Sequence, residues 1–589
     1  SPLDGLGKLA AACEKVAGNG DKALAITDHG TLGGAWKFAN AARKAGIKPI
    51  IGTEAYLALA SHWSQNPDRN DAKSVDVPRD DESSTDVDSD ESAATAASPM
   101  KTKRNQHITL LAKNSAGWIN LVEMSNKANQ SFYGKPLMDF DLLKEHGEGI
   151  IILTGCLGGP VLGPVSRGEM DEARHNLGRL VDAVGRENVF VEIMEHGIPS
   201  ETAALPKMAE LAAEFGLPLV ATNDAHYIHA EQAQTHEAWL AVQSGKTLDD
   251  PKRFQFHGAG FHLRSETEMR ELRTEGWWQT AISNTVMIAD LCEDVIPAPQ
   301  MRLPDFPLPE GFSTLRDFYI SQVKDGAIRK FGFPLSDEVR TRLNYETSVI
   351  EPAGFMIVQD VINWARSQGI RVGPGRGSAA GSLTSYCLGI VAVDPLENNL
   401  LFERFLEPGR KGMPDIDVDF EKARRHEVLQ YLAERWGSDR VARIGSFSAA
   451  KTRRALRDAA KLLKQSGVGD ALSKAVPMGD GGQPYDFHQL ADESDPAGIR
   501  FRDVLSSFGD AGCAVLDLAK GFAGTVNGES IHACGTLIAD TDLRALVPLR
   551  EDRAKSNSSG LTVVTQWDGQ DIDAFGLLKL DVLGLRNLD

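Results

Sequence analysis

Residues 413–420 of the chain are MPDIDVDF, and this stretch decides the expected fold of the second half of the sequence. Apolar residues, two of them β-branched and one aromatic, alternate with acidic ones, which is typical of a half-buried strand. Successive side chains of a strand point to opposite faces. The carboxylates would therefore share one face: Asp415, Asp417 and Asp419.

Three neighbouring carboxylates repel one another unless hard cations lie between them. Two Mg²⁺ ions held about 4 Å apart by such a set can activate a hydroxyl and stabilise the leaving oxygen of a phosphoryl displacement. A solvated acidic strand face explains the same pattern, and both interpretations stay open on this segment alone. A D-x-D-x-D calcium loop is disfavoured because it needs glycine where Phe420 stands.

Upstream of the acidic strand lies a glycine-rich segment, GPGRGSAAGS (373–382), and a helix is expected to follow over 379–390. Backbone N–H groups at such a helix start, with Arg376 beside them, suit a triphosphate. The segment is not a Walker A loop, because no GK[ST] follows. Alone it is more often a turn, but a glycine loop before an acidic strand is the order found in a nucleotidyltransferase palm.

The remaining pattern predicts an α/β multidomain chain. Short β-rich runs such as GIIILTG (149–155) and NVFVEIMEHG (188–197) alternate with helical stretches over residues 1–283. A proline-rich linker follows at 295–312. We expect a second α/β unit in two parts, 284–445 and 516–589, split by a helical insertion at 446–515.

Composition narrows the class of protein. The net charge of −19 argues mildly against a nucleic-acid partner, but ten acidic and three basic residues lie between Asp68 and Glu91. Residues 61–105 are expected to form a disordered acidic insertion.

Six cysteines without a CxxC pair indicate a reducing cytoplasm, and the sequence shows neither a secretory signal nor a membrane span. Both chain ends look cut, because the first residue is not Met and the last run has no stop signal.

Side chains that bind metals stand at the ends of several strands expected in the first unit. A single His or Cys is more often packed than a ligand, but several at successive strand ends suit Zn²⁺ or Mn²⁺. These residues are Asp28, His29, Glu54, His107, Cys156, Asp224 and His226.

Four motifs together resemble one family. The run from GPGRGSAAGS to MPDIDVDF, with HACGTLIA (532–539), VTQWD (564–568) and LLKLDVLGLR (577–586), is similar to the palm of the bacterial DNA polymerase III alpha subunit, the C family. The resemblance covers essentially the whole chain. It implies a PHP domain, a distorted α/β barrel, followed by a nucleotidyltransferase-like palm with an inserted helical thumb. The family's fingers would follow Asp589.

The resemblance also implies roles for palm residues. It places two catalytic Mg²⁺ ions on Asp417, Asp419 and Asp581, with the strand of Asp581 paired beside that of Asp417, and it leaves Asp415 outside the set. Nucleotide contacts are implied for Gly377 and Ser378, and Arg376 lies beside them in the sequence. Lys579, two residues before Asp581 and therefore on the same strand face, could contact phosphate or primer.

The resemblance also implies functional residues in the thumb and in the PHP domain. The helix KTRRALRDAAKLLK (451–464) would grip DNA, although a solvated basic face explains it equally well; its candidate contacts are Lys451, Arg453, Arg454 and Arg457. The family usually has a basic residue shortly before HACG, and TVNGESIHACG lacks one here. The implied PHP ligands for Zn²⁺ or Mn²⁺ are Asp4, His29, Glu54, His107, Cys156, Asp224 and His226, and an HxH motif is expected just before Ser1.

The expected reaction is template-directed addition of dNMP to a primer 3′-hydroxyl, with the PHP domain acting as a metal-dependent 3′→5′ proofreading exonuclease. Primer–template DNA and dNTPs would be partners, and the sliding clamp and other replisome subunits would bind regions beyond this chain. The closest alternative is an error-prone polymerase paralogue with the same palm. The palm motifs speak against a PHP-type phosphatase of small molecules, and the presence of all three palm carboxylates disfavours a non-catalytic scaffold that binds the clamp loader.

Overall fold

The computed structural model describes residues 4–58, 105–130, 134–407, 416–552 and 561–589. The chain divides into two compact units. Unit 1 comprises residues 1–296 and 447–529, and unit 2 comprises residues 297–446 and 530–589. Among the described helices, none is both long enough and apolar enough to cross a membrane. The predicted disorder of 61–105 falls almost entirely outside the described residues, as does Asp415.

Unit 1 is built on a mixed sheet with the strand order β1-β2-β3-β5-β6-β7, and β4 pairs with β2. Strand β3 runs antiparallel to both of its neighbours, and the other pairs are parallel. The strands are β1 (Ala23–Ile26), β2 (Lys48–Ala58), β3 (Asn105–Ala112), β4 (Leu137–Asp139), β5 (Ile150–Leu153), β6 (Val189–Ile193) and β7 (Leu219–Ala221).

Helices alternate with these strands, as the sequence predicts. They are α1 (Leu9–Asn19), α2 (Ala35–Ala45), α3 (Ser115–Gln130), α4 (Phe140–Glu145), α5 (Leu162–Arg167), α6 (Met170–Val184), α7 (Pro199–Phe215), α8 (Ala233–Gln243), α9 (Glu266–Glu271) and α10 (Gly276–Leu291). One core cluster joins sheet residues such as Ile151 and Phe190 to Ile288 of α10. The expected domain end at residue 283 therefore falls inside a helix that packs on the sheet.

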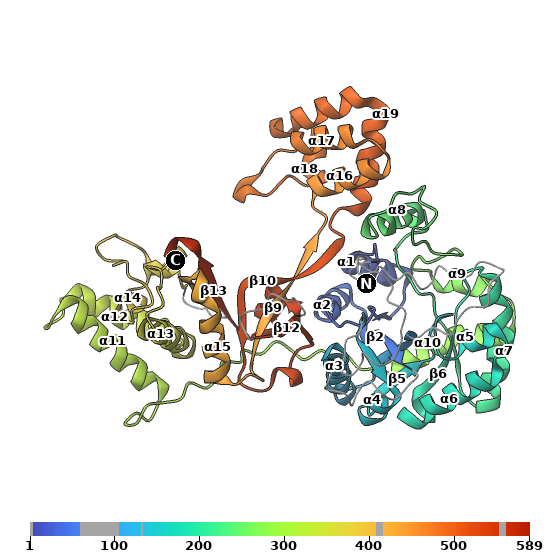
Figure 1. Ribbon diagram of the computed structural model, residues 1–589, viewed down its shortest axis with the longest axis horizontal. Coiled ribbons are helices and arrows are strands. Elements are labelled where there is room, and N and C mark those ends of the chain that lie inside the picture. Colours follow the sequence, from blue (N-terminus) through green and yellow to red (C-terminus); the bar gives the residue numbers. More distant parts are fainter. Residues whose placement is uncertain (1–3, 59–104, 131–133, 408–415, 553–560) are drawn as a thin grey trace, which may run out of the picture. The chain divides into compact units, whose positions relative to one another are not determined.

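The inserted segment of unit 1 is helical and forms one cluster in Figure 1. It contains α16 (Thr452–Leu462), α17 (Ser466–Ala475), α18 (Phe487–Ala491) and α19 (Ile499–Phe522). Ala455, Leu456 and Ala459 recur at helical spacing on the buried face of α16. The sequence placed the end of this insertion at residue 515, but α19 continues to Phe522 because that ring is buried against Trp239 of α8.

Unit 2 combines a helical layer with a six-stranded sheet of order β11-β12-β9-β10-β13-β8. Its helices are α11 (Leu315–Phe331), α12 (Asp337–Val349), α13 (Pro352–Ser367), α14 (Leu383–Cys387), α15 (Arg425–Trp436) and α20 (Gly569–Phe575). Its strands are β8 (Asp417–Glu421), β9 (Val441–Ala449), β10 (Val526–Ile538), β11 (Leu549–Glu551), β12 (Val563–Asp568) and β13 (Leu578–Leu585).

The core of unit 2 explains why its two sequence segments form one sheet. Val418 and Phe420 of β8 and Val582 of β13 belong to the same buried cluster as residues of α13 such as Phe355 and Ile357. In the sequence, the helical insertion lies between β9 and β10, and these two strands are neighbours in this sheet. The predicted mixed α/β architecture is thus confirmed, with the insertion leaving the sheet intact.

Candidate metal centres

The acidic face of β8 lies beside β13. The two strands are parallel, and Asp581 is the register partner of Asp417, so the predicted pairing of these strands is confirmed. Asp419 stands two residues further along β8 and therefore on the same face as Asp417. Because neighbouring strands are about 4.8 Å apart, the three carboxylates converge on one patch of the sheet.

Two cationic side chains accompany these carboxylates. The Arg376 guanidinium lies 3.2 Å from Asp417 and 3.8 Å from Asp419, and the Lys579 ammonium lies 3.0 Å from Oδ2 of Asp581. Asp419 and Asp581 are 7% and 5% exposed. The Oδ1 atoms of both accept no hydrogen bond from any described residue.

Buried carboxylate oxygens without donors are costly unless a cation satisfies them. Three carboxylates against two cationic side chains leave the patch with a net negative charge. Hard oxygen ligands of this kind suit Mg²⁺. The residues present therefore fit the predicted metal site.

The glycine-rich segment is fastened to the acidic strand at its first residue. The Gly373 N–H donates to the Asp419 carbonyl at 2.8 Å, and a Cβ at residue 373 would lie only 2.9 Å from the Asp419 Cβ. Gly375 and Gly377 have φ of 93° and 65°, a conformation that favours glycine. The segment therefore brings Arg376 over the carboxylates because glycine permits both the approach and the turn.

The helix expected over 379–390 is wrong in one respect, because it breaks into a 3-10 turn (Gly377–Gly381) and the short α14. Glu346 of α12 explains the break. Its fully buried carboxylate accepts hydrogen bonds from the Leu383 and Thr384 N–H groups and from the Ser382 hydroxyl at 2.8–2.9 Å. The start of α14 is thus occupied by a protein carboxylate, which leaves the turn that begins at Gly377 as the candidate phosphate position in this segment.

Two residues beside Asp581 belong to the HACG motif that the sequence singles out without giving them a role. His532 and Cys534 of β10 each offer a ligand atom, and these atoms and one of Asp581 lie within 4.8 Å of one another. Burial and the nearby Asp581 charge raise the pKa of the Cys534 thiol to about 11. The sequence could not place them, because β10 meets β13 only in the folded sheet.

The basic side chains of α16 differ in how they are held. Lys451, Arg454 and Arg457 are exposed. Arg453 is half-buried and donates to the Val476 carbonyl at 2.5 Å. Three of the four predicted DNA contacts are therefore on the surface, whereas the fourth ties two helices of the insertion together.

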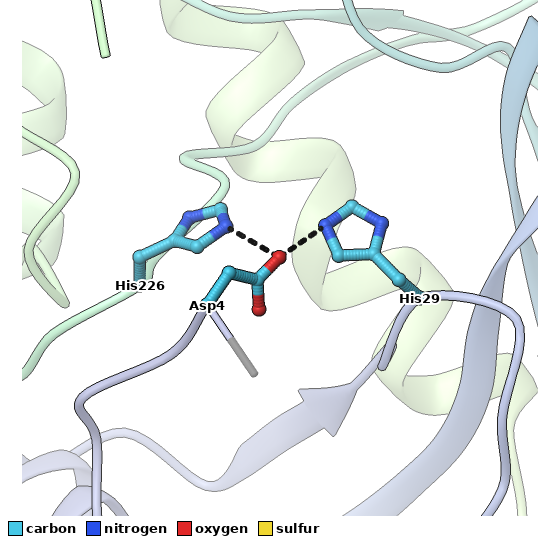
Figure 2. A group of neighbouring side chains, drawn as sticks. All are labelled: Asp4, His29 and His226. Carbon is cyan, nitrogen blue, oxygen red and sulfur yellow. Dashed lines mark ion pairs between the residues drawn. The ribbon is translucent and has the colours of Figure 1, made fainter. Parts of the chain in front are cut away.

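In unit 1, a second cluster gathers around Asp4. Its Oδ2 atom lies 3.1 Å from Nε2 of His29 and 3.9 Å from Nε2 of His226. Figure 2 shows the two imidazoles on either side of this one oxygen. His29 follows β1 and His226 follows β7, so residues from both edges of the sheet meet here.

The remaining predicted ligands extend this cluster. Glu54 lies 3.5 Å from Nδ1 of His29 and 2.8 Å from Nδ1 of His107. The Cys156 sulfur lies 3.9 Å from the same His107 nitrogen, and Asp224 lies 3.6 Å from Nδ1 of His226. The structure thus brings together all seven residues predicted as ligands.

Charge coupling within the cluster is strong. Burial raises the pKa of Glu54, but the positive charge of His29 and the hydrogen bond from His107 outweigh it and lower that pKa to about 2. The pKa of Asp4 is also lowered, because His29 again outweighs burial. Ionised carboxylates, imidazoles and a thiol are the donor set that Zn²⁺ and Mn²⁺ prefer, so these residues fit the predicted metals.

A cavity of about 370 Å³ adjoins this cluster and is lined by Asp28, Glu54 and Glu192, among other residues. Glu192 was missed by the sequence analysis because it sits inside an apolar strand, VFVEI. It is 2% exposed, and burial raises its pKa to about 7 despite hydrogen bonds from Thr222 and the Gly155 N–H.

His236 of α8 was missed as well. Its Nε2 atom lies 2.8 Å from the Asp4 carbonyl, and burial lowers its pKa to about 3. A histidine inside a helix carries no sequence signal for this position. Its neutral ring supports the backbone of the candidate ligand Asp4.

Comparison with known proteins finds two family models in this chain. The PHP domain matches residues 1–196, and the domain described as bacterial DNA polymerase III alpha NTPase domain matches residues 317–584. The first match contains five of the seven candidate ligands clustered in unit 1, and the second contains the three carboxylates of unit 2.

Relatives named DNA polymerase III subunit alpha match over nearly the whole chain. The protein from Mycobacterium tuberculosis is 38% identical over 100% of this chain and 49% of its own length. That from Thermus aquaticus is 36% identical over 96% and 48%, and that from Treponema pallidum is 33% identical over 100% and 47%. The chain spans about half the length of the curated relatives it matches.

Proposed function

The chain belongs to the bacterial DNA polymerase III alpha family, and from this premise we propose that unit 2 carries the nucleotidyl-transfer site of a DNA-directed DNA polymerase. The reaction would add dNMP from a dNTP to a primer 3′-hydroxyl and release pyrophosphate. One observation carries the proposal: Asp417 and Asp581 are register partners on neighbouring strands, with Asp419 beside them and a glycine loop fastened to the same strand.

In this proposal the three carboxylates bind two Mg²⁺ ions. Bound there, the metal would supply Lewis acidity for the primer hydroxyl and for the developing charge on phosphate. Arg376 and Lys579, which pair with the carboxylates in the structure, would turn toward phosphate oxygens of the incoming nucleotide. Gly377 and Ser378 would present backbone N–H groups to the triphosphate.

The sheet order suggests where each substrate lies. The glycine loop is attached at β8, the edge strand of the sheet, and β13 separates β8 from β10. The triphosphate would therefore approach from the β8 edge, and the primer end would lie toward β13 and β10. The exposed Lys451, which caps the N-terminus of α16, and the exposed Arg454 and Arg457 of α16 would contact the phosphate backbone of the duplex.

We also propose a second activity, for the cluster of unit 1: metal-dependent cleavage of phosphoester bonds, acting as 3′→5′ proofreading. Its support is the convergence of seven ligand-type side chains next to a cavity. Zn²⁺ or Mn²⁺ bound there would supply an activated water. Glu192, whose pKa is about 7, is placed to exchange a proton near neutral pH.

The alternatives are not favoured. A small-molecule phosphatase does not explain the polymerase family match over 317–584, and a non-catalytic scaffold does not explain buried carboxylates without hydrogen-bond donors. The relatives reported above carry the name of the replicative subunit rather than that of an error-prone paralogue. Replisome partners, including the sliding clamp, would bind the full-length protein.

Primer extension by the full-length protein tests the main proposal. Asp419→Asn removes one ligand charge with little change of shape, so we expect at least a hundredfold loss of extension rate. Glu551→Gln on β11, at the opposite edge of the same sheet, is the matched control and should extend normally. An Asp419→Asn variant that extends primers within tenfold of wild type would refute the assignment.

A further inference from the structure

The HACG motif places a histidine and a cysteine against one of the proposed catalytic carboxylates. Gly535 of β10 is the register partner of Asp581 in the antiparallel pair with β13. His532 and Cys534 lie on the same strand, and one ligand atom from each falls within 4.8 Å of one from Asp581. The proposed nucleotidyl transfer gives neither side chain a role.

Gly535 makes room for the imidazole. A Cβ at this position would lie 2.7 Å from Nδ1 of His532, so any other residue would force the ring to shift. Glycine is therefore needed here for space, and the space it leaves is filled by a nitrogen ligand.

The separation of the ligand atoms matches that around a tetrahedral ion. Nδ1 of His532 and Sγ of Cys534 are 3.5 Å apart. Around a tetrahedral zinc ion, with bonds of about 2.3 Å to sulfur and about 2.0 Å to nitrogen, these two atoms would be about 3.5 Å apart. Binding by these two side chains of β10 would thus need little change in their separation.

One carboxylate oxygen of Asp581 is available to bind a cation. Lys579 pairs with its Oδ2 atom, while its Oδ1 atom is buried and accepts no hydrogen bond from the described residues. The side chain as a whole is 7% exposed. An unpartnered carboxylate oxygen next to nitrogen and sulfur completes a His–Cys–Asp set, which suits Zn²⁺ and related thiophilic cations better than Mg²⁺.

We infer that His532, Cys534 and Asp581 form a binding site for a thiophilic divalent cation of the Zn²⁺ type. The site differs in chemistry from the carboxylate patch of β8 and shares one ligand with it. A cation held there would draw Asp581 toward β10 and away from Asp417. Zn²⁺ would then act as an inhibitor of nucleotidyl transfer, a consequence that rests on the proposed function, whereas the site itself rests on geometry alone.

A cation that binds at this site must displace or oppose interactions that are already present. The Gly535 N–H donates to Nδ1 of His532 at 2.8 Å, and a metal at that nitrogen replaces this hydrogen bond. The Lys579 ammonium beside Asp581 also opposes a cation. We therefore expect weaker binding of the cation than at a closed structural zinc site, so that binding is reversible.

Cobalt spectroscopy on this chain tests the site without any assay of activity. The Cys156→Ala variant serves as background, because it removes the sulfur of the unit 1 cluster. Addition of Co²⁺ should produce a thiolate-to-cobalt charge-transfer band in the near ultraviolet, and Zn²⁺ should displace it. The band should vanish in Cys534→Ser and weaken at least tenfold in apparent affinity in His532→Ala, but persist in Cys513→Ser, which changes an exposed cysteine.

Cys534→Ser is nearly isosteric, and circular dichroism verifies that it folds. No band in the Cys156→Ala background, or a band that survives Cys534→Ser, overturns the inference. A second assay separates the site from the proposed function: zinc inhibition of primer extension by the full-length protein, with each variant normalised to its own zinc-free rate. A cobalt band that depends on Cys534, combined with equal zinc inhibition of wild type and Cys534→Ser, would support the site and count against the role given to Asp581.

Discussion

Asp581 on β13 and Asp417 on β8 are register partners across a parallel strand pair, although a helical insertion and four further strands separate them in sequence. Their carboxylates are held side by side by the backbone ladder rather than by loops. A site built on paired strands is rigid, and a two-cation site needs ligands held to within a fraction of an ångström.

The register pairing of Asp417 with Asp581 predicts that substitutions of these two residues have non-additive effects on primer extension. Asp417→Asn and Asp581→Asn should each reduce single-turnover primer extension by the full-length protein at least a hundredfold, because each removes one ligand charge. If both residues serve the same pair of ions, the double variant should be about as slow as the slower single variant. Rapid-quench kinetics measure all three. Effects that multiply fully would show that the two carboxylates act independently.

The exposed cations of α16 should set the salt dependence of duplex binding. Arg454→Ala combined with Arg457→Ala should weaken binding irrespective of sequence and reduce the slope of log K against log salt by about 2. Fluorescence anisotropy over a salt series provides the slope. Arg453→Ala is the control on the same helix: because Arg453 donates to the Val476 carbonyl, it should lower thermal stability and leave the slope unchanged. An unchanged slope in the double variant would exclude this face from the DNA contact.

Metal binding by unit 1 should depend on His29 most of all, because its ring lies between Asp4 and Glu54. His29→Ala should lower the affinity of the chain for Mn²⁺ or Zn²⁺ more than tenfold, as measured by competition with a chromophoric chelator. His175→Ala, on the exposed face of α6, should bind as wild type does. Equal metal content in both variants after dialysis would show that the cluster is not a metal site.

The buried Glu192 should make stability depend on pH. Its pKa rises from 4.5 to about 7 on folding, so between these values the folded state holds a proton that the unfolded state releases. Its contribution to stability is greatest below pH 4.5 and is lost as pH rises to about 7, by roughly 3 kcal/mol.

Glu192→Gln cannot ionise and should abolish that loss. Urea unfolding of the metal-free chain at pH 5 and pH 8 should therefore show a smaller difference between the two pH values in Glu192→Gln than in wild type. Glu210→Gln, exposed on α7, should behave as wild type does. An identical pH difference in Glu192→Gln and wild type would mean that Glu192 is ionised in the folded protein at pH 5.

The sequence by itself determined the α/β class, the acidic strand that became β8 and the candidate ligands, because strand periodicity and motif spacing are local properties. MPDIDVDF indicated a strand with acidic residues on one face, and Asp417 and Asp419 lie on β8 as expected. The seven candidate ligand positions of unit 1 could likewise be named from strand ends and from the family resemblance.

Only the tertiary structure decided what these residues meet. Glu346 occupies the helix start that the sequence offered to a phosphate. Glu192 and His236 lie at the unit 1 cluster without any local signal, and Cys534, although part of a recognised motif, meets Asp581 only in the folded sheet. Such contacts join residues far apart in the chain, and they depend on strand order and on burial. Both of these are set by the packing of the whole core, so no window of the sequence contains them.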